Sequence, residues 1–185
     1  TQIEVQDTYV ASDTLRFVAG LGIRYQYASS ETYYSGSVNN TVRWAFGHME
    51  YRPLPWLTSN VGGYVEHNSM SGTTFSPRVA LNAHLSDSQT IRLVVSEGTR
   101  SPDLFEQKAV WSYTLTDLTP PPLGQSTATL FLNTRAKSTD LRSERIVSKE
   151  LGYLQTWRHL GLTLDAKLFD DQLSRLISGH LETTD

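Results

Sequence analysis

Strict alternation of apolar and polar residues is the feature that most narrows what this sequence can fold into. Every second side chain is apolar from Phe75 to Leu85, and the alternation resumes from Ile91 to Val95 after a polar turn at 86–89. A period of two places successive side chains on opposite faces of a strand, so these runs predict an antiparallel hairpin. Each run has about nine or ten residues, the length of a tilted strand that crosses a bilayer.

Two stretches of the sequence carry a family resemblance. They are SPRVALNAHLSDSQTIRLVVSEGTRSPDLFEQ, and SERIVSKELGYLQTW followed by LGLTLDAKLFDDQLSRLIS. Both stretches resemble the TonB-dependent receptors of bacterial outer membranes. The likeness runs from about residue 2 to residue 177 and is strongest at 75–107 and 144–177. It implies part of a receptor barrel and does not identify a ligand.

The composition excludes several classes of function. A formal net charge of −3 over 185 residues argues against a nucleic-acid binder, which needs a basic face. Cysteine is absent, which excludes disulfides, thiol nucleophiles and cysteine zinc sites. Aromatic residues are common, yet no run approaches the ~20 apolar residues of a membrane helix. Membrane strands with one polar, lumen-facing side produce this combination.

The predicted fold class is all-β, an antiparallel up-and-down meander of about eight strands within a large transmembrane β-barrel. The clearest stripe runs from Leu15 to Tyr27 and ends in two tyrosines, as an interfacial girdle does. In the next strand the apolar parity changes between Phe46 and Met49, so a bulge is predicted at Gly47.

The whole of residues 1–185 is expected to be a partial barrel domain. Thr1 to Glu4 has the pattern of a strand interior rather than of a signal peptide, and the final LETTD has that of a loop. The resemblance then implies that a plug domain and the remaining strands are absent, since large receptor barrels have about 22 strands.

The predicted connections alternate between short and long. The short ones are 12–14, 52–55, 86–89 and 158–159, and the longer ones are 28–41, 67–74 and 100–143. Successive turns of an antiparallel meander lie at opposite ends of the sheet, so all short turns should share one end. Outer-membrane barrels have short periplasmic turns and long extracellular loops.

Charged residues at the polar positions of the strands are candidates for lining the lumen: Arg16, Arg24, Glu66, Arg78, Arg92, Asp165 and Lys167. One interpretation is a charged passage that steers an anionic ligand inward. The alternative is mutual ion pairing between neighbouring strands, which satisfies their charges within the sheet. The resemblance adds a third role, because polar lumen residues of the family hold the plug.

Aromatic and basic residues in the predicted outer loops are candidates for ligand binding: Tyr33, Tyr34, Arg100, Trp111, Tyr113 and Arg135. Family members bind iron chelates with such residues. The alternative is packing of the loops on themselves, or anchoring at the membrane interface. The segment 101–106, SPDLFE, is assigned a structural role, with Pro102 ending the strand and Leu104 and Phe105 packing on the barrel rim.

No catalytic or metal site is predicted. The five histidines lack metal-ligand spacing, and no G-x-S-x-G elbow is present. Ser76 and His84 would lie ~26 Å apart along one strand, too far for a nucleophile and its base. The sequence therefore predicts no enzyme and no cofactor.

The leading functional hypothesis is a portion of a TonB-dependent receptor that imports a nutrient chelate, a ferric siderophore first among the candidates. The implied partners are outer-membrane lipid, TonB, the plug domain and a small iron chelate, and the implied location is the bacterial outer membrane. Two alternatives stay open: a self-contained eight-stranded barrel with a structural or adhesive role, and a soluble β-sandwich that binds carbohydrate.

Overall fold

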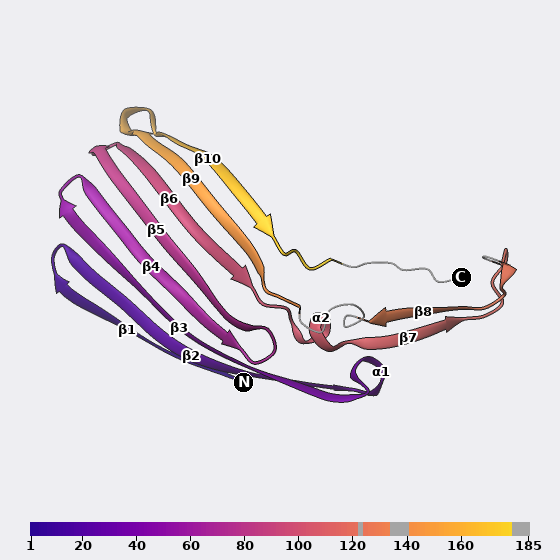
Figure 1. The fold of residues 1–185 in the computed structure, drawn as a ribbon. Helices are drawn as coiled ribbons and strands as arrows, with labels where there is room; N and C mark the ends of the chain where they lie inside the picture. Colours follow the sequence, from indigo (N-terminus) through magenta and orange to yellow (C-terminus); the bar gives the residue numbers. More distant parts are fainter. Residues whose placement is uncertain (122–123, 134–140, 179–185) are drawn as a thin grey trace.

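The computed structural model describes residues 1–121, 124–133 and 141–178. Eight strands form one antiparallel sheet in the order β1-β2-β3-β4-β5-β6-β9-β10, and β7 and β8 form a separate hairpin (Figure 1). The all-β meander is confirmed. In chain order the elements are β1 (Gln2–Ser12), β2 (Leu15–Ser30), α1 (Glu31–Tyr34), β3 (Gly36–Leu54), β4 (Leu57–Asn68), β5 (Gly72–Ser86), β6 (Gln89–Arg100), α2 (Leu104–Lys108), β7 (Val110–Leu115), β8 (Ala128–Asn133), β9 (Glu144–Trp157), a 3-10 turn (Arg158–Leu160) and β10 (Leu162–Ser174).

The sheet is curved and open (Figure 1). The cross-strand registers put the apolar rows together on one face, and the buried residues Trp44, Ala80 and Val94 lie on the other. Side chains converge on the concave side of a curved sheet and bury one another there, so we assign the exposed apolar rows to the outer, convex face. Leu21 is 65% exposed and Phe75 58% exposed, and within the described residues no second layer covers either row. A β-sandwich would bury such rows between two sheets. The β-sandwich alternative is therefore wrong for this chain.

The two edges of the sheet, β1 and β10, do not pair with each other. Each of the two strands pairs with a single neighbour, and every residue of both strands is exposed. Eight strands that sealed a small barrel would join first and last strands in one ladder. The self-contained eight-stranded barrel is therefore not the observed architecture.

Trp44 and Phe46 lie on the concave face, opposite two glycines of β2. The ladder pairs Gly20 with Phe46 and Gly22 with Trp44. A Cβ on either glycine would overlap the ring that it faces, so the absent side chains make room for the aromatic rings. This arrangement gives the concave side a local apolar patch that alternation alone did not predict.

The predicted bulge at Gly47 is wrong. β3 pairs with both neighbours through this residue without a shift of register. The change of apolar parity instead reflects the position of Trp44 and Phe46 on the concave face. We call the loop end of the sheet, with α1, α2 and the β7–β8 hairpin, the mouth. The register shifts that do occur lie beside the short turns, between Val10 and Ser12, between Tyr51 and Leu54, and between His84 and Ser86.

The strands are longer than predicted, and the loops are correspondingly shorter. β2 has 16 residues and β3 has 19, so the predicted loop at 28–41 shrinks to α1 and its flanks. Backbone hydrogen bonds continue the ladder through polar residues, because pairing does not require apolar side chains. The tips of β2 and β3 therefore extend beyond the ~9–11 residues that cross a bilayer.

The composition of residues 100–143 predicted an irregular loop, but part of this connection is regular. It contains α2 and the β7–β8 hairpin, in which Val110 pairs with Asn133 and Leu115 with Ala128. All short turns lie at one end of the sheet, and α1, α2 and the hairpin lie at the other (Figure 1). None of the helices in the described ranges has the length and apolarity needed to cross a membrane.

One cross-strand row shows how the strands are staggered. It begins at Phe17, the third residue of β2, and ends at Asp170, the ninth residue of β10. Between them the paired positions are Met49, Val61, Val79, Val95 and Lys149. The row thus climbs one residue per strand. With ~3.3 Å per residue and ~4.8 Å between strands, this stagger tilts the strands by roughly 35°.

Pro77 marks the place where β5 and β6 separate. The β5–β6 ladder ends at the pair Arg78–Ser96, although β5 remains paired to β4 through Pro77 and β6 remains paired to β9 as far as Arg100. Proline has no amide hydrogen to donate to the next strand. Beyond this point, at the loop end, side chains connect the two strands.

Candidate functional site

The seven candidate lumen residues share one face of the sheet. The cross-strand registers put Arg16, Arg24, Glu66, Arg78, Arg92, Asp165 and Lys167 on the concave side, away from the apolar rows. Because β-strand side chains alternate, a single consistent register decides this for all of them.

Two of these arginines form ion pairs with glutamates on the next strand. Arg16 Nη2 lies 3.1 Å from Glu50 Oε2, and the other oxygen of Glu50 binds Arg52 at 2.9 Å. Arg92 binds Glu150 across the β6–β9 ladder. Sequence reasoning had not identified these glutamates, although each occupies a concave-face position opposite or beside its arginine. Such pairs hold neighbouring strands together and neutralise the face.

Arg24 belongs to a mixed cluster near the aromatic patch. Its Nε donates to Gln2 Oε1 at 3.0 Å, and its guanidinium lies 5.5 Å from the centre of the Trp44 ring. The Trp44 indole N–H in turn donates to Glu4 Oε2 at 2.9 Å. A cation over an aromatic face is an attractive arrangement. The cluster ties β1, β2 and β3 together on the concave side.

The remaining lumen candidates differ in their partners. Glu66 accepts from Ser101 Oγ at 2.7 Å and from Tyr64 Oη at 3.2 Å. Lys167 and Asp165 face each other along β10 at 3.5 Å. Arg78 has no hydrogen bond or ion pair with any described residue. Within the described residues, Arg78 is thus a concave-face cation without a polar partner.

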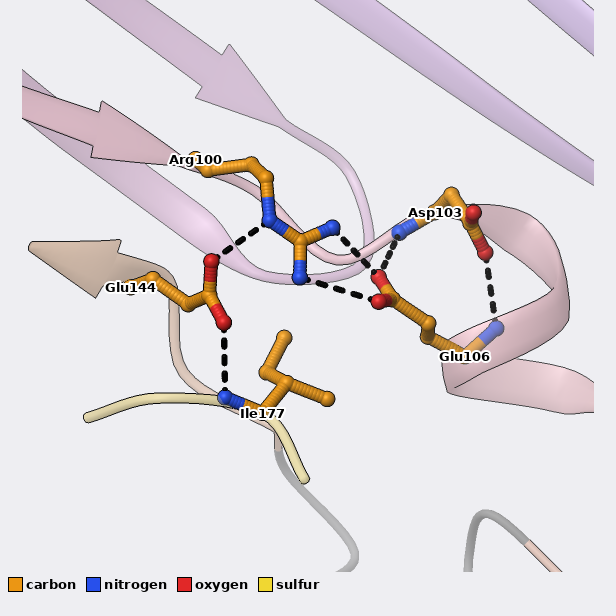
Figure 2. A network of polar contacts seen from close by, with 5 residues as sticks. All are labelled: Arg100, Asp103, Glu106, Glu144 and Ile177. Atoms are coloured by element: carbon orange, nitrogen blue, oxygen red, sulfur yellow. Dashed lines mark hydrogen bonds and ion pairs between the residues drawn. The ribbon is translucent and has the colours of Figure 1, made fainter. Parts of the chain in front are cut away.

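Arg100 lies at the mouth, at the centre of a network that joins four segments of chain (Figure 2). Its Nε donates to Glu144 Oε2 at 2.6 Å, and its two terminal nitrogens each donate to the Glu106 carboxylate at 2.9 Å. The second oxygen of Glu144 accepts the Ile177 N–H at 2.7 Å. The guanidinium therefore connects the end of β6 with helix α2 and the start of β9, and Glu144 extends the connection to the chain that follows β10.

Helix α2 begins with a capping box that sequence inspection could have found. Asp103 Oδ1 accepts the Glu106 N–H at 2.7 Å, and Glu106 Oε2 accepts the Asp103 N–H at 2.9 Å. The spacing D-x-x-E within SPDLFE is the signature of this motif. Pro102 is buried just before it. The segment has the structural role assigned to it from the sequence, but as a capped helical turn.

The charges of this network lower the pKa of both carboxyl groups. Hydrogen bonds from Arg100 and from the Ile177 backbone lower the pKa of Glu144 to about 2. The Arg100 hydrogen bond is also the main cause that lowers the pKa of Glu106. Both glutamates are beyond the apolar band, at the loop end of the sheet. They are therefore ionised partners of Arg100 at neutral pH.

The aromatic candidates of the outer loops pack partly on one another. The Tyr33 ring lies edge-on to Phe105 at 5.9 Å and to Trp111 at 6.5 Å between centroids. These two contacts join α1 to α2 and β7. For Tyr33 and Trp111 they correspond to the alternative in which the loops pack on themselves. Edge-to-face geometry is the favourable arrangement of such rings. Tyr113 is different, because 57% of it is exposed.

The other two loop candidates are less defined by contacts. Tyr34 closes the four-residue helix α1 and is half-buried. Arg135 lies outside the described residues. In the described part of the chain, no group of three histidine, aspartate or glutamate side chains has a metal-binding arrangement. The geometry thus consists of a polar, largely ion-paired face below an aromatic and charged mouth.

Comparisons with known proteins agree with this architecture. A family model described as "TonB dependent receptor-like, beta-barrel" matches residues 4–180. No curated protein matches the chain. A variant of the ferric enterobactin receptor PfeA from Pseudomonas aeruginosa is similar with a TM-score of 0.72 at 16% identity, over 93% of this chain and 26% of the receptor.

Two siderophore receptors named PirA show the same fold. The one from Pseudomonas aeruginosa has a TM-score of 0.67 at 14% identity, over 92% of this chain and 30% of its own. The one from Acinetobacter baumannii has a TM-score of 0.59 at 14% identity, over 90% and 30%. This chain thus spans about a quarter to a third of the receptors that it matches. With its apolar convex face, its polar concave face and the match over residues 4–180, the chain belongs to the TonB-dependent receptor family, as part of the β-barrel.

Proposed function

We propose that the complete protein imports a ferric siderophore across the bacterial outer membrane, with energy supplied through TonB. The chain contributes about eight wall strands, and we place the plug domain and the other strands elsewhere in the complete protein. Family membership implies an outer-membrane location, and the family and fold are those of transport receptors rather than of enzymes.

One observation carries this proposal: the same eight strands separate an uncovered apolar face from a polar face lined with charges. Leu21 at 65% exposure and Leu168 at 72% have no cover from the described residues, as lipid-facing positions require. On the other face, Arg78 is a cation without a partner among the described residues. A hydrated passage for an anionic chelate fits this arrangement.

The choice of a siderophore draws on what the related receptors bind. Structures of PfeA from Pseudomonas aeruginosa include complexes with enterobactin, and both PirA proteins are siderophore receptors. In the present chain, exposed Tyr113 at the mouth offers an aromatic face to a chelate. We assign it the direct contact, and we assign Trp111 and Arg100 to the framework that holds the mouth.

Uptake of radioactive iron tests the function. A strain that lacks the complete protein should lose uptake of one ferric siderophore from a panel, and a plasmid copy should restore uptake only when TonB is present. Normal uptake of every chelate in the deletion strain would contradict the proposal. So would restored uptake in the absence of TonB.

A pair of tyrosine variants tests the mouth. Tyr113→Ala should weaken binding of that siderophore by about fivefold to tenfold, the effect of losing one aromatic contact. Tyr27→Ala removes a tyrosine of similar exposure from the convex face and should leave affinity unchanged. Equal affinities of the two variants would remove Tyr113 from the ligand site.

A further inference from the structure

Among the described residues, the convex face carries a cation that has no hydrogen-bond or ion-pair partner. By their registers, Arg43, Arg145 and Lys149 all belong to this face. Arg145 binds Glu97, and Lys149 lies 3.9 Å from Asp170. Arg43 is exposed and has no hydrogen bond or ion pair with a described residue. At the edge of an apolar surface such a guanidinium is free to bind an anionic group from outside the protein.

The position of Arg43 along its strand places it at the edge of the apolar band. It lies eleven residues from Leu54, where β3 ends at a short turn. With the tilt given above, this distance is about 30 Å along the barrel axis, whereas the apolar band of such barrels is about 25 Å tall. By the same estimate Lys149 lies about 22 Å from the short-turn end, within the band.

The neighbours of Arg43 agree with an interfacial depth. Its partner on β4 is His67, and Tyr25 of β2 lies one pleat closer to the mouth. His67 is exposed, and its Nδ1 lies 2.8 Å from Thr73 Oγ1, so Nε2 remains for an outside partner. Tyrosine and histidine are residues of the headgroup level of a membrane. Arg43 and His67 thus form a small polar pair above an apolar surface.

An apolar groove lies directly beside this pair. It has a volume of about 320 Å³ and is lined by Ile3, Val5, Leu21, Gly22, Ile23, Arg43 and Trp44. The groove runs over β1 and β2 on the convex face, toward the short turns. A hydrocarbon chain can fill it while a group at the end of that chain reaches Arg43.

From this juxtaposition we propose that Arg43, with His67, binds the phosphate of an anionic membrane lipid whose acyl chain occupies the groove. Guanidinium binds phosphate through two parallel N–H···O bonds, and its charge is balanced at the depth where lipid phosphates lie. The site rests on the membrane placement proposed above. It is separate from the concave face and from the mouth, so it has no part in holding the chelate.

Lipids with matched chains test the site in the complete protein. The probes are dioleoyl phosphatidic acid, dioleoylglycerol, which lacks only the phosphate, and inorganic phosphate, which lacks the chains. Native mass spectrometry of purified protein should show phosphatidic acid retained about tenfold better than dioleoylglycerol, as expected for a charge-assisted hydrogen bond. Equal retention of the two lipids would overturn the proposal, and so would competition by inorganic phosphate at the same concentration as the lipid.

Two variants locate the effect. Arg43→Gln should lose about tenfold in retention of phosphatidic acid. Lys149→Gln is the matched control, because it removes a convex-face cation that already has Asp170 as its partner, and it should bind as the unaltered protein does. Equal behaviour of the two variants would contradict the assignment. If Arg43→Gln does not fold, the comparison of the three probes on the unaltered protein still decides.

The outcome is separable from the fate of the proposed function. A protein that does not insert into phosphatidylcholine nanodiscs would contradict the membrane placement itself. A protein that inserts normally but does not discriminate phosphatidic acid from dioleoylglycerol contradicts only the lipid site.

Discussion

On β9, Leu151 and Tyr153 point to the convex side, whereas Glu150, the residue before Leu151, binds Arg92 on the concave side. The backbone of the strand is the same for all three, and only the parity of the position differs. Leu151 is 45% exposed without cover from the described residues, while Glu150 is half-buried in its ion pair. The contrast teaches that register alone decides which chemistry each environment receives.

An arginine on each face should give the largest difference. Leu151→Arg is expected to lower the free energy of unfolding in lipid vesicles by about 2–4 kcal/mol, because it places a charge against the hydrocarbon. Ser148→Arg, on the concave face of the same strand and opposite Asp171, should change it by about 0.5 kcal/mol or less. Urea titration of the complete protein in vesicles measures both. Similar losses would mean that the two faces meet the same solvent.

Filling the space at Gly22 should give the next largest effect. Gly22→Ala puts a Cβ into the volume of the Trp44 ring and should cost about 1–3 kcal/mol by overpacking. Trp44→Ala removes that ring, so in the double variant the alanine at position 22 should cost much less. The same vesicle titration gives the coupling energy. Strict additivity would show that the ring and the glycine do not constrain each other.

Breaking the Arg92–Glu150 pair should have a smaller effect. Arg92→Gln alone leaves a half-buried glutamate without its counter-charge, and the loss should be about 1 kcal/mol. The double variant Arg92→Gln with Glu150→Gln removes both charges and should recover part of the stability that the single variant loses. A double-mutant cycle in the same assay separates the pair from the single changes. A coupling near zero would mean that water screens the pair.

Acid should loosen the mouth with the smallest overall effect. The pKa of Glu144 is lowered in the folded protein from 4.5 to about 2, so its contribution is complete above the unfolded value and is lost as the pH falls toward 2. Proteolysis near Ile177 should therefore rise in that window, and in Glu144→Gln it should already be high at pH 7. An acid-stable protease supplies the measurement. Equal cleavage of both proteins at pH 7 would contradict the role of Glu144.

Much of the wall could be predicted from the sequence, because lipid exposure makes the alternation strict. The stripe from Leu15 to Tyr27 placed β2 and its face correctly, and the same pattern gave the eight-strand meander. The change of parity after Trp44 and Phe46 was wrongly interpreted as a bulge at Gly47, since the concave position of the two rings depends on Gly20 and Gly22 of the neighbouring strand. A pairing of this kind cannot be found from the alternation of one strand.

The mouth was harder to predict than the wall. Composition made 100–143 look irregular, and the capping box of Asp103 and Glu106 was overlooked although its spacing is visible. The hydrogen bond from Arg100 to Glu144 and the ring contact between Tyr33 and Trp111 join residues far apart in sequence. Such contacts have no periodic signal, because the order of the loops in space decides them.

The early end of the β5–β6 ladder at Pro77 divides the upper wall along a seam. Below Arg78 and Ser96 the two strands share backbone bonds, but above them the seam is crossed by side-chain bonds from Ser76 to Thr99 and from Ser101 to Glu66. Hydroxyl groups exchange such bonds with water at little cost, whereas a ladder must be broken pair by pair. Above Pro77 the β6–α2–β9 side of the rim is therefore joined to the β1–β5 side by side-chain contacts, which are these hydroxyl bonds and the contacts of the Tyr33 ring with Phe105 and Trp111.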